Sequence, residues 1–482
     1  MPSHTLGSAQ GKEPTVATTS MAHNAMWPEW DMMQTLLDGT DAMRAAGEAY
    51  LPRHESEGET RYAERLAGNV LFNVTDLTLR TWVGKPFSSA VQYTDDFAPH
   101  LKPFIGDIDL QGNNVDVFAR EWFANGVSHS LSHVMVDFPR VNFFPGRTLK
   151  DDANENVRPY CVQIAPENVI FASSERIDGV DTLTHVRIRE WDVQRVDWEE
   201  VVTERIKVYD REWVFPDEET NALTEAQVFV KVTTWDYDTE KTEWVDRGFF
   251  YMDIDFIPLV TFYSNKTGFM TGKSPLLDLA HLNVRHWQSN SDQIAILTVA
   301  RFPLLACSGG NSEETQVVVG PNEFLFVDDP SGKWYYVEHK GAAIEAGDRE
   351  LTKLEQQMMA YGSEFMKKKP DRQTASARNL DSSEATSPLQ DVVTRFTDSL
   401  NRMFWIMSYW MDRVEDHEGK AFVRTDFTDP DSASLQTLYN TWKEGGIGNK
   451  EYLHELQRRS VLDEHFDFEK NDRSAKKTET VE

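Results

Sequence analysis

Residues 274–300 read SPLLDLAHLNVRHWQSNSDQIAILTVA, and residues 344–366 read IEAGDRELTKLEQQMMAYGSEFM. In the first stretch, Ser274 is suited to cap a helix, and Pro275 is suited to the first helical position because its missing N–H has no partner there. In the second stretch, apolar residues recur at steps of three and four, as in a narrow coiled-coil seam: Leu351, Leu354, Met358, Tyr361 and Phe365. The two stretches therefore predict a pair of long helices.

A small β insert is predicted between these helices. The segments FPLLACSG, TQVVVG, EFLFVDD and KWYYVEH are typical of short strands, and residues 329–332 form a turn sequence between the last two. After the second helix, residues 371–386 are polar and lack an apolar stripe, so they predict a loop. A stripe over residues 387–412 then predicts a third long helix.

The preceding part of the chain predicts helices followed by strands. Residues 1 to about 25 are rich in Ser, Thr, Ala and Gly and predict a mobile arm, with the fold beginning near Trp27. Three-four periodicity predicts helices over about 27–47, 58–83 and 113–136. Alternation of apolar and polar residues from about 159 to 263 predicts an antiparallel sheet. This order indicates an α+β chain rather than an alternating, doubly wound one.

The end of the chain predicts two shorter helices, at about 432–444 and 449–460, before a charged tail. With 482 residues, the chain is long enough for two or more folding units or one elongated subunit.

The composition narrows the functional classes. Lys and Arg number 49 against 79 Asp and Glu, a formal charge of −30 that would repel a DNA backbone over most of the surface. Such a charge would suit a channel wall along which DNA slides without sticking. Cys161 and Cys307 lie far apart and outside any CxxC pattern, which argues against a disulfide framework or a zinc site. Apolar runs are too short to span a bilayer, and no signal peptide pattern opens the chain, so neither a membrane nor a secreted protein is predicted.

The segment TGFMTGKS at residues 267–274 resembles a phosphate-binding loop only in its end, Gly272, Lys273 and Ser274. Thr267 stands where the first glycine of that motif belongs, and Pro275 follows directly. Helix capping is the favoured interpretation, and nucleotide binding is the alternative.

His129 and His133 stand four apart on the predicted helix 113–136, as two metal ligands could. The HSLSH segment has no HExxH glutamate and offers no third ligand, so surface or interface histidines are the favoured interpretation. Carboxylates are too numerous for any pair to indicate acid–base chemistry. We therefore assign no catalytic, cofactor-binding or metal-binding residue and predict a non-enzymatic protein without a cofactor.

Three segments resemble those of one subfamily of portal proteins from tailed double-stranded-DNA bacteriophages. They are YLPRHESEGETRYAERLAGNVLFNVTDLTLRTWVGKPF at residues 50–87, SPLLDLAHLNVRHWQSNSDQ at residues 274–293, and the stretch from Thr374 to Leu389. The order of elements also resembles the portal fold over nearly the whole chain. The resemblance implies a ring, a dodecamer in virions, at the capsid portal vertex, with a channel for DNA packaging and ejection.

The resemblance also implies a division of the chain. Its parts would be a disordered arm (1–27), the wing (28–273), stem helix 1 (274–300), the clip (301–343), stem helix 2 (344–366), the tunnel loop (367–386), a long wing or crown helix (387–412) and the C-terminal crown (413–482). The implied partners are further copies of the chain, the terminase large subunit, head–tail adaptor or tail proteins, major capsid and scaffold proteins, and duplex DNA in the channel. Assembly would take place in the host cytoplasm.

Two residue groups are candidate contact sites. The tunnel loop would touch DNA phosphates through Lys367, Lys368, Lys369, Arg372 and Arg378, although lysines at a helix end also favour its dipole without any ligand. The clip would contact neighbouring subunits through Trp334, Tyr335 and Tyr336, which could instead fill a local β core.

Two other functional classes stay open from the sequence. One is a nucleotide- or metal-dependent enzyme that uses the GKS segment or the His129/His133 pair. The other is a different acidic assembly protein such as a scaffold or adaptor, although a scaffold would be mostly helical.

Overall fold

The computed structural model describes residues 13–140, 148, 151, 154–215, 226–301, 304–308, 331–337, 341–364, 388–412, 414, 419–425, 432–458 and 462. The chain divides into two compact units. The first unit comprises Met1–Thr81, Trp122–Met135 and Val162–Leu389, and the second comprises Trp82–Glu121, Val136–Cys161 and Gln390–Glu482. Helices and strands are mixed as the predicted α+β class requires.

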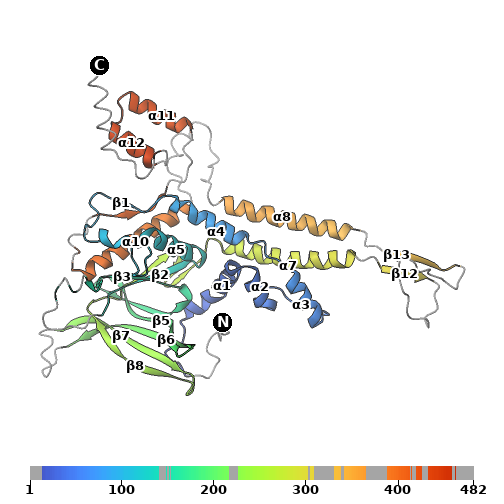
Figure 1. The fold of residues 1–482 in the computed structure, drawn as a ribbon, viewed down its shortest axis with the longest axis horizontal. Helices are drawn as coiled ribbons and strands as arrows, with labels where there is room; N and C mark the ends of the chain where they lie inside the picture. Colours follow the sequence, from blue (N-terminus) through green and yellow to red (C-terminus); the bar gives the residue numbers. More distant parts are fainter. Residues whose placement is uncertain are drawn as a thin grey trace. The chain divides into compact units, whose positions relative to one another are not determined.

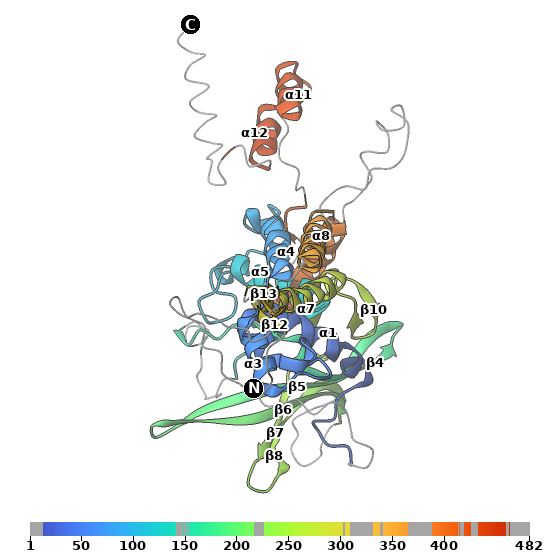
Figure 2. The ribbon, with the colours of Figure 1, turned by 90° about the vertical axis from the view of Figure 1, so that its right-hand side faces the viewer.

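A five-stranded antiparallel meander dominates the first unit (Figure 2). Its strands follow chain order: β4 Val169–Ile177, β5 Val180–Val196, β6 Glu199–Val214, β7 Gln227–Asp238 and β8 Glu243–Met252. The alternation that predicted strands is confirmed, because Val186, Val230 and Val232 lie fully buried on one face while their sequence neighbours are more exposed. The antiparallel sheet prediction is therefore correct.

A second sheet corrects the predicted helix 113–136. Helix α5 spans only Val115–Ser128, and Ser130, at φ 74°, turns the chain into β2, Leu131–Asp137. This strand lies between β3, Tyr160–Ile164, and β9, Leu259–Tyr263, and pairs with β9 from Leu131 opposite Tyr263 onward. Its apolar run suits a helix stripe or a buried strand equally, so strand pairing decided the outcome.

The N-terminal arm is also corrected. Residues 13–20 are not a mobile arm, because Val16 and Ala17 pack on the apolar cluster of Ile170, Ile206 and Val208. Helix α1 begins at Met21 rather than near Trp27, and the Ser20 hydroxyl caps it by accepting from the amide of His23 at 3.1 Å. Residues 1–12 lie outside the described residues.

Helix α1 spans Met21–Asp38 and α2 spans Thr40–Ala46, with Gly39 at φ 87° between them. The predicted single helix 58–83 is wrong, since α3 is Glu59–Gly68 and α4 is Val74–Gly84. Asn69 is extended between them, where its side-chain amide donates to the carbonyl of Trp287 at 2.8 Å. Its own carbonyl accepts two hydrogen bonds from Arg44. The bonds from Arg44 take the Asn69 carbonyl, which a continuous helix would have used, and the side-chain bond to Trp287 holds the extended residue in place.

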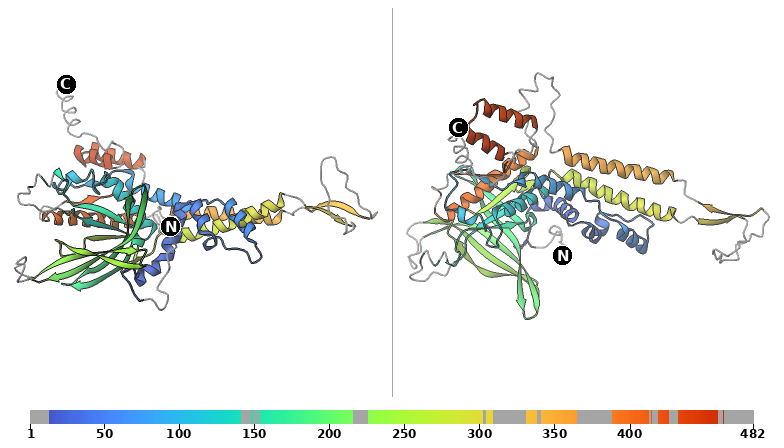
Figure 3. Two further views of the ribbon diagram at one scale, coloured as in Figure 1. Left: turned by 60° about the horizontal axis from the view of Figure 1, so that its bottom comes forward. Right: turned by 45° about the horizontal axis from the view of Figure 1, so that its top comes forward.

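The first unit also contains the two long helices predicted from the sequence. They are α7, Leu277–Ala300, and α8, Ala342–Glu364, and they run side by side with the hairpin β12–β13 at one end (Figures 1 and 3). Strand β12 is Leu304–Ser308 and β13 is Lys333–Val337, antiparallel to each other. The predicted strands TQVVVG and EFLFVDD lie outside the described residues.

The second unit is built around α10, Pro388–Trp410, which confirms the third long helix. One stripe of α10 is buried: Val392, Val393, Phe396, Leu400, Met403, Phe404 and Met407. Strand β1, Gln92–Tyr93, pairs with β14, Ala421–Phe422. Helices α11, Ser432–Lys443, and α12, Asn449–Arg458, agree with the two predicted C-terminal helices.

The remaining elements are short. The 3-10 helices are Gly47–Ala49, Pro86–Ser88, Lys102–Phe104 and Pro166–Asn168, and the strands β10, Lys266–Gly268, and β11, Thr271–Gly272, form a small hairpin. Among the described residues, the helices are either too short or too polar to cross a membrane.

Candidate functional site

The α7/α8 pair is an antiparallel two-helix rod, and each helix is about 35 Å long at about 1.5 Å per residue. Contacts run along its whole length. At one end, the side-chain amide of Gln293 donates to the carbonyl of Ile344 at 2.9 Å. Arg285 pairs with Glu350 at 2.9 Å near the middle. The Tyr361 hydroxyl donates to the carbonyl of Pro275 at 3.3 Å near the other end.

The predicted coiled-coil seam is confirmed in part, because Leu351 and Tyr361 are only half-buried. Leu354 and Met358 of α8 are buried, as are Leu279 and Trp287 of α7. The last member of the predicted seam, Phe365, lies outside the described residues. Burial of these apolar side chains adds to the polar contacts between the two helices.

Two glycines let α8 approach its neighbours closely. A Cβ at Gly347 would overlap the side chain of Gln293, and a Cβ at Gly362 would lie 2.7 Å from the hydroxyl oxygen of Thr78 in α4. Neither position tolerates a larger residue without movement, so α8 is held tightly between α7 and α4.

A buried asparagine joins α7 to the start of α4. The Asn283 Oδ1 accepts from both the amide and the hydroxyl of Thr75, each at 3.0 Å, and its Nδ2 donates to the carbonyl of Phe72 at 3.0 Å. Asn283 and Thr75 have no exposed surface. Because every bond is made inside the protein, the contact fixes the position and the rotation of α4 on α7.

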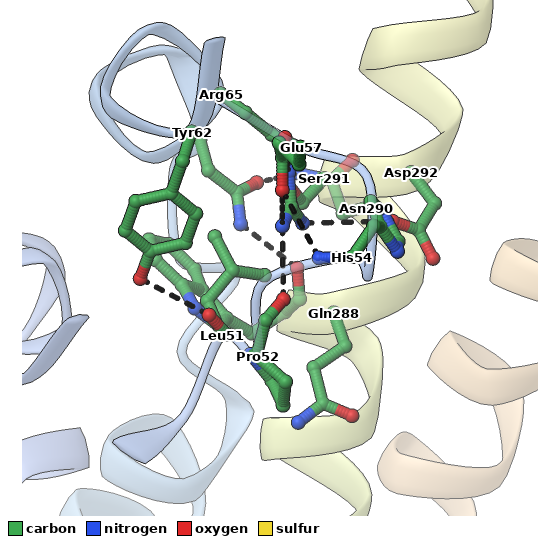
Figure 4. A network of polar contacts seen from close by, with 12 residues as sticks. Leu51, Pro52, His54, Glu57, Tyr62, Arg65, Gln288, Asn290, Ser291 and Asp292 are labelled. Carbon is green, nitrogen blue, oxygen red and sulfur yellow. Dashed lines mark hydrogen bonds and ion pairs between the residues drawn. The ribbon is translucent and has the colours of Figure 1, made fainter. Parts of the chain in front are cut away.

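A polar network centred on Arg65 ties the segment before α3 to α7 (Figure 4). The guanidinium makes a two-point ion pair with Glu57, at 2.8 and 2.7 Å, and donates to the carbonyl of Pro52 at 2.9 Å and to the Ser291 hydroxyl at 3.3 Å. The Arg65 and Glu57 side chains are only 6% and 5% exposed. Hydrogen bonding to Arg65 lowers the pKa of Glu57, and the same bond raises the pKa of Arg65.

Further bonds in this region reach the next turns of α7. The Gln288 side chain donates to the carbonyl of Tyr50 at 3.0 Å, and His54 lies 3.4 Å from Asp292. Asn290 donates to the Asn69 side chain at 2.9 Å. The rod is therefore braced along one side by residues 50–69, which belong to a segment that resembles portal proteins.

The hairpin at the end of the rod carries the predicted clip aromatics. Trp334 is half-buried and stands opposite Cys307, whereas Tyr335 is exposed and stands opposite Ala306. Tyr336 lies in β13 opposite Leu305. The predicted DNA-contacting residues Lys367, Lys368, Lys369, Arg372 and Arg378 lie outside the described residues.

The GKS segment has no phosphate-loop geometry. Gly272 closes the β10–β11 hairpin, the amide of Lys273 donates to the carbonyl of Asn265 at 3.0 Å, and its ammonium group lies 3.4 Å from Asp278. The Ser274 hydroxyl donates to the carbonyl of Val127 at 2.8 Å and accepts from the amide of Leu276 at 3.1 Å. The capping interpretation agrees with this geometry, although α7 begins at Leu277, so Pro275 precedes the helix instead of standing inside it.

The sequence predicted that His129 and His133 share one face of a helix, and this prediction is wrong. His129 follows the end of α5, whereas His133 lies in β2 and its Nδ1 is 3.0 Å from the Thr261 hydroxyl. Both side chains are buried, so the surface interpretation is also wrong. Burial lowers the pKa of His129 to about 4 and that of His133 to about 3. No group of three or more potential metal ligands occurs among the residues that the structure describes.

Comparison with known proteins gives one family match and several structural neighbours. Residues 275–411 match a family described as a domain of unknown function (DUF4055). This range holds α7, the hairpin, α8 and α10. No curated protein matches the chain.

The structural neighbours come from gene transfer agent (GTA) particles. The neck of the native particle, computed with C12 symmetry, is 10% identical, with a TM-score of 0.41, and the match covers 86% of this chain and 98% of that chain. The virion of the native particle is 11% identical, with a TM-score of 0.38 and the same coverage of both chains. The neck of the empty particle, computed with C6 symmetry, is 12% identical, with a TM-score of 0.38, and the match covers 87% of this chain and 98% of that chain.

Proposed function

We propose that this chain is the subunit of a portal-type ring at the capsid vertex of a tailed phage or phage-like particle. The ring would form the channel for DNA packaging and ejection and the docking site for the terminase and for tail or adaptor proteins. The observation that carries the proposal is the α7/α8 rod with the β12–β13 hairpin at its end, followed in the chain by α10. In a ring, one such rod from each subunit would form the wall of the channel.

Stiffness supports this role, because a channel wall must keep its shape while DNA moves past it. The rod combines an apolar seam, close contacts at Gly347 and Gly362, and the polar anchors of Asn283 and Arg65. Discrete, fully bonded contacts of this kind hold one arrangement of helices rather than many.

Charge supports it as well. Helix α8 carries five carboxylates against two basic residues: Glu345, Asp348, Glu350, Glu355 and Glu364 against Arg349 and Lys353. With a chain charge of −30, a ring of such subunits would repel the DNA backbone over most of its surface. Phosphate contacts would then be few and local, and DNA could slide.

The finer assignments follow the sequence resemblance. Residues 274–300 and 344–366 would be the stem, 301–343 the clip, 367–386 the tunnel loop, 28–273 the wing, and 413–482 the crown. The basic run that begins at Lys367 would supply the local phosphate contacts, and the clip would face the terminase and later the adaptor. ATP hydrolysis would be performed by the terminase and not by this chain.

The test is the mass and symmetry of the purified protein, measured by mass photometry and by electron microscopy of end-on views. We expect closed rings of about a dozen subunits with a central hole. If the protein forms no rings by itself, the same imaging is applied to capsid shells assembled with its own scaffold and capsid proteins. Monomers or dimers in both preparations would refute the proposal.

A further inference from the structure

The β5–β6 hairpin extends beyond its neighbouring strands (Figure 2). The pairing of β4 with β5 ends where Val169 stands opposite Ile188, and the pairing of β7 with β6 ends where Asp236 stands opposite Arg205. Pairing between β5 and β6 continues to Val196 and Glu199. Residues 189–204, here called the ribbon, therefore pair with no third strand among the described residues.

The ribbon is rich in exposed apolar side chains. They are Trp191, Val193, Val196, Trp198, Val201 and Val202, and Trp198 at the tip is 93% exposed. Val193 stands directly opposite Val202, so these two side chains share a face with each other, while Val201 and its partner Gln194 share the opposite face. An isolated two-stranded ribbon is marginally stable in water, and apolar groups on both of its faces indicate a surface that another protein covers.

The tip of the ribbon is acidic. The carboxylates near its base are paired: Glu190 with Lys207, Asp192 with Arg205, and Glu204 with Arg189. At the tip, Asp197, Glu199 and Glu200 surround Trp198, and the one cation there, Arg195, lies 5.7 Å from the Trp198 ring. A surface that receives this tip should offer aromatic rings and a positive charge.

The same sheet presents a surface of that kind at its other end. Phe249 and Tyr251 of the edge strand β8 are exposed, and their ring centroids lie 5.6 Å apart. Phe229 lies 6.2 Å from Tyr251, and the ammonium of Lys231 lies 4.8 Å from the centre of the Phe249 ring. The only ion pair of Lys231 among the described residues is a long one, 3.7 Å to Glu212. These residues, 229, 231, 249 and 251, are called the aromatic patch.

The ribbon tip of a chain is out of reach of its own aromatic patch. Lys231 stands opposite Asp210 of β6, twelve residues from Trp198, which is about 40 Å at about 3.3 Å per residue. Two different surfaces, far apart on one rigid sheet, can meet only between copies. Such head-to-tail contacts close into a ring when the rotation between copies allows it.

We propose that the ribbon of one subunit docks on the aromatic patch of the next copy of this chain. Trp198 stacks on Phe249 and Tyr251 there, and Lys231 faces the acidic tip. The inference rests on the ring proposed above and names one of its subunit contacts.

Cross-linking between copies tests this contact. Trp198→Cys and Tyr251→Cys subunits, both carrying Cys307→Ser, are mixed and treated with a short bismaleimide; Cys161 is retained because it is fully buried. We expect covalent dimers in the mixture and none with either variant alone, and a ladder of larger species from the double variant. Val180→Cys replaces Trp198→Cys in the matched control, because Val180 is exposed at the opposite end of β5 and should not cross-link to Cys at position 251.

The cross-linking and the ring imaging together distinguish a wrong subunit contact from the absence of a ring. Rings that form without the 198–251 cross-link overturn the ribbon contact alone, whereas absence of rings from both preparations described above overturns both. As a second measurement, Trp198→Glu should raise the concentration for half-maximal ring assembly about tenfold or more, with an unchanged melting temperature, because the side chain is exposed in the isolated subunit. Assembly equal to that of Val180→Glu would overturn the contact.

Discussion

Replacement of Asn283 by alanine should loosen the start of α4 on α7. The amide and hydroxyl of Thr75 would lose a buried partner, and the carbonyl of Phe72 would lose its partner at a partly buried position. An unpaired buried group costs about 1–3 kcal/mol, and the Phe72 carbonyl is only partly buried, so we expect a total loss of about 3 kcal/mol. A loss of that size corresponds to about a 100-fold shift in the local opening equilibrium.

Hydrogen exchange followed by mass spectrometry measures this opening directly, because it reports each segment separately. Amides of residues 70–81 should exchange about 100-fold faster in Asn283→Ala than in the original chain. Thr298→Ala is the matched control on the same helix, since the exposed Thr298 hydroxyl donates to the carbonyl of Ile294 within α7 and to no other group of the described residues. Exchange of residues 70–81 within about threefold of the original rate, in a folded Asn283→Ala protein, would show that Asn283 does not hold α4 on α7.

Two further predictions concern charge. Glu57→Gln should lower the free energy of unfolding by about 2 kcal/mol at pH 7. This is less than for a fully enclosed ion pair, because Asp292, which also pairs with Arg65, is half exposed. Arg65 lowers the pKa of Glu57 below its usual 4.5. The ion pair therefore stabilises the fold fully above pH 4.5, and this stabilisation is lost as the pH falls through the pKa of Glu57 in the folded protein. The difference in melting temperature between the two proteins should therefore shrink below about pH 4, and a constant difference would contradict the assignment. Neutralising the basic run, Lys367, Lys368, Lys369, Arg372 and Arg378, should impair DNA packaging or retention while rings still form, and unchanged packaging would contradict the tunnel-loop contact.

Elements with strong local patterns could be predicted from the sequence. The helices α7, α8 and α10 show apolar residues at steps of three and four, and their buried stripes, such as Leu354 and Met358, agree with that spacing. The strands β4–β8 alternate in the same way. In these elements, buried and exposed positions alternate with the period of the helix or strand backbone. The element can therefore be predicted from the order of apolar residues without knowing which distant residues they contact.

Elements whose local pattern fits two structures were predicted wrongly. Leu131–Val136 suits a helix or a strand, and its place between β3 and β9 makes it a strand. The break at Asn69 depends on Trp287 and Arg44, which lie far away in the sequence. Residues 13–20 lack large apolar groups, but Arg187 donates to the carbonyls of Thr15, Val16 and Thr18 and helps to hold the segment on the sheet.

The candidate site divides in the same way. The aromatic residues of the hairpin and the rod helices could be found from the sequence, because their composition is unusual locally. The anchor residues Asn283, Arg65 and Glu57 carried no signal, since polar residues are common and their importance comes from burial and partners. The ribbon could not be predicted from the sequence either, because apolar residues are common in strands. Their exposure follows only from the points at which β4 and β7 stop pairing with the hairpin.

Periodicity and composition are local properties, so they identified the long helices, the sheet region and the acidic charge. The breaks in the helices, the burial of His129 and His133, and the polar residues that brace the rod became visible only in the folded chain. Those outcomes depend on hydrogen bonds and strand pairs between residues far apart in the chain, and no local pattern records them.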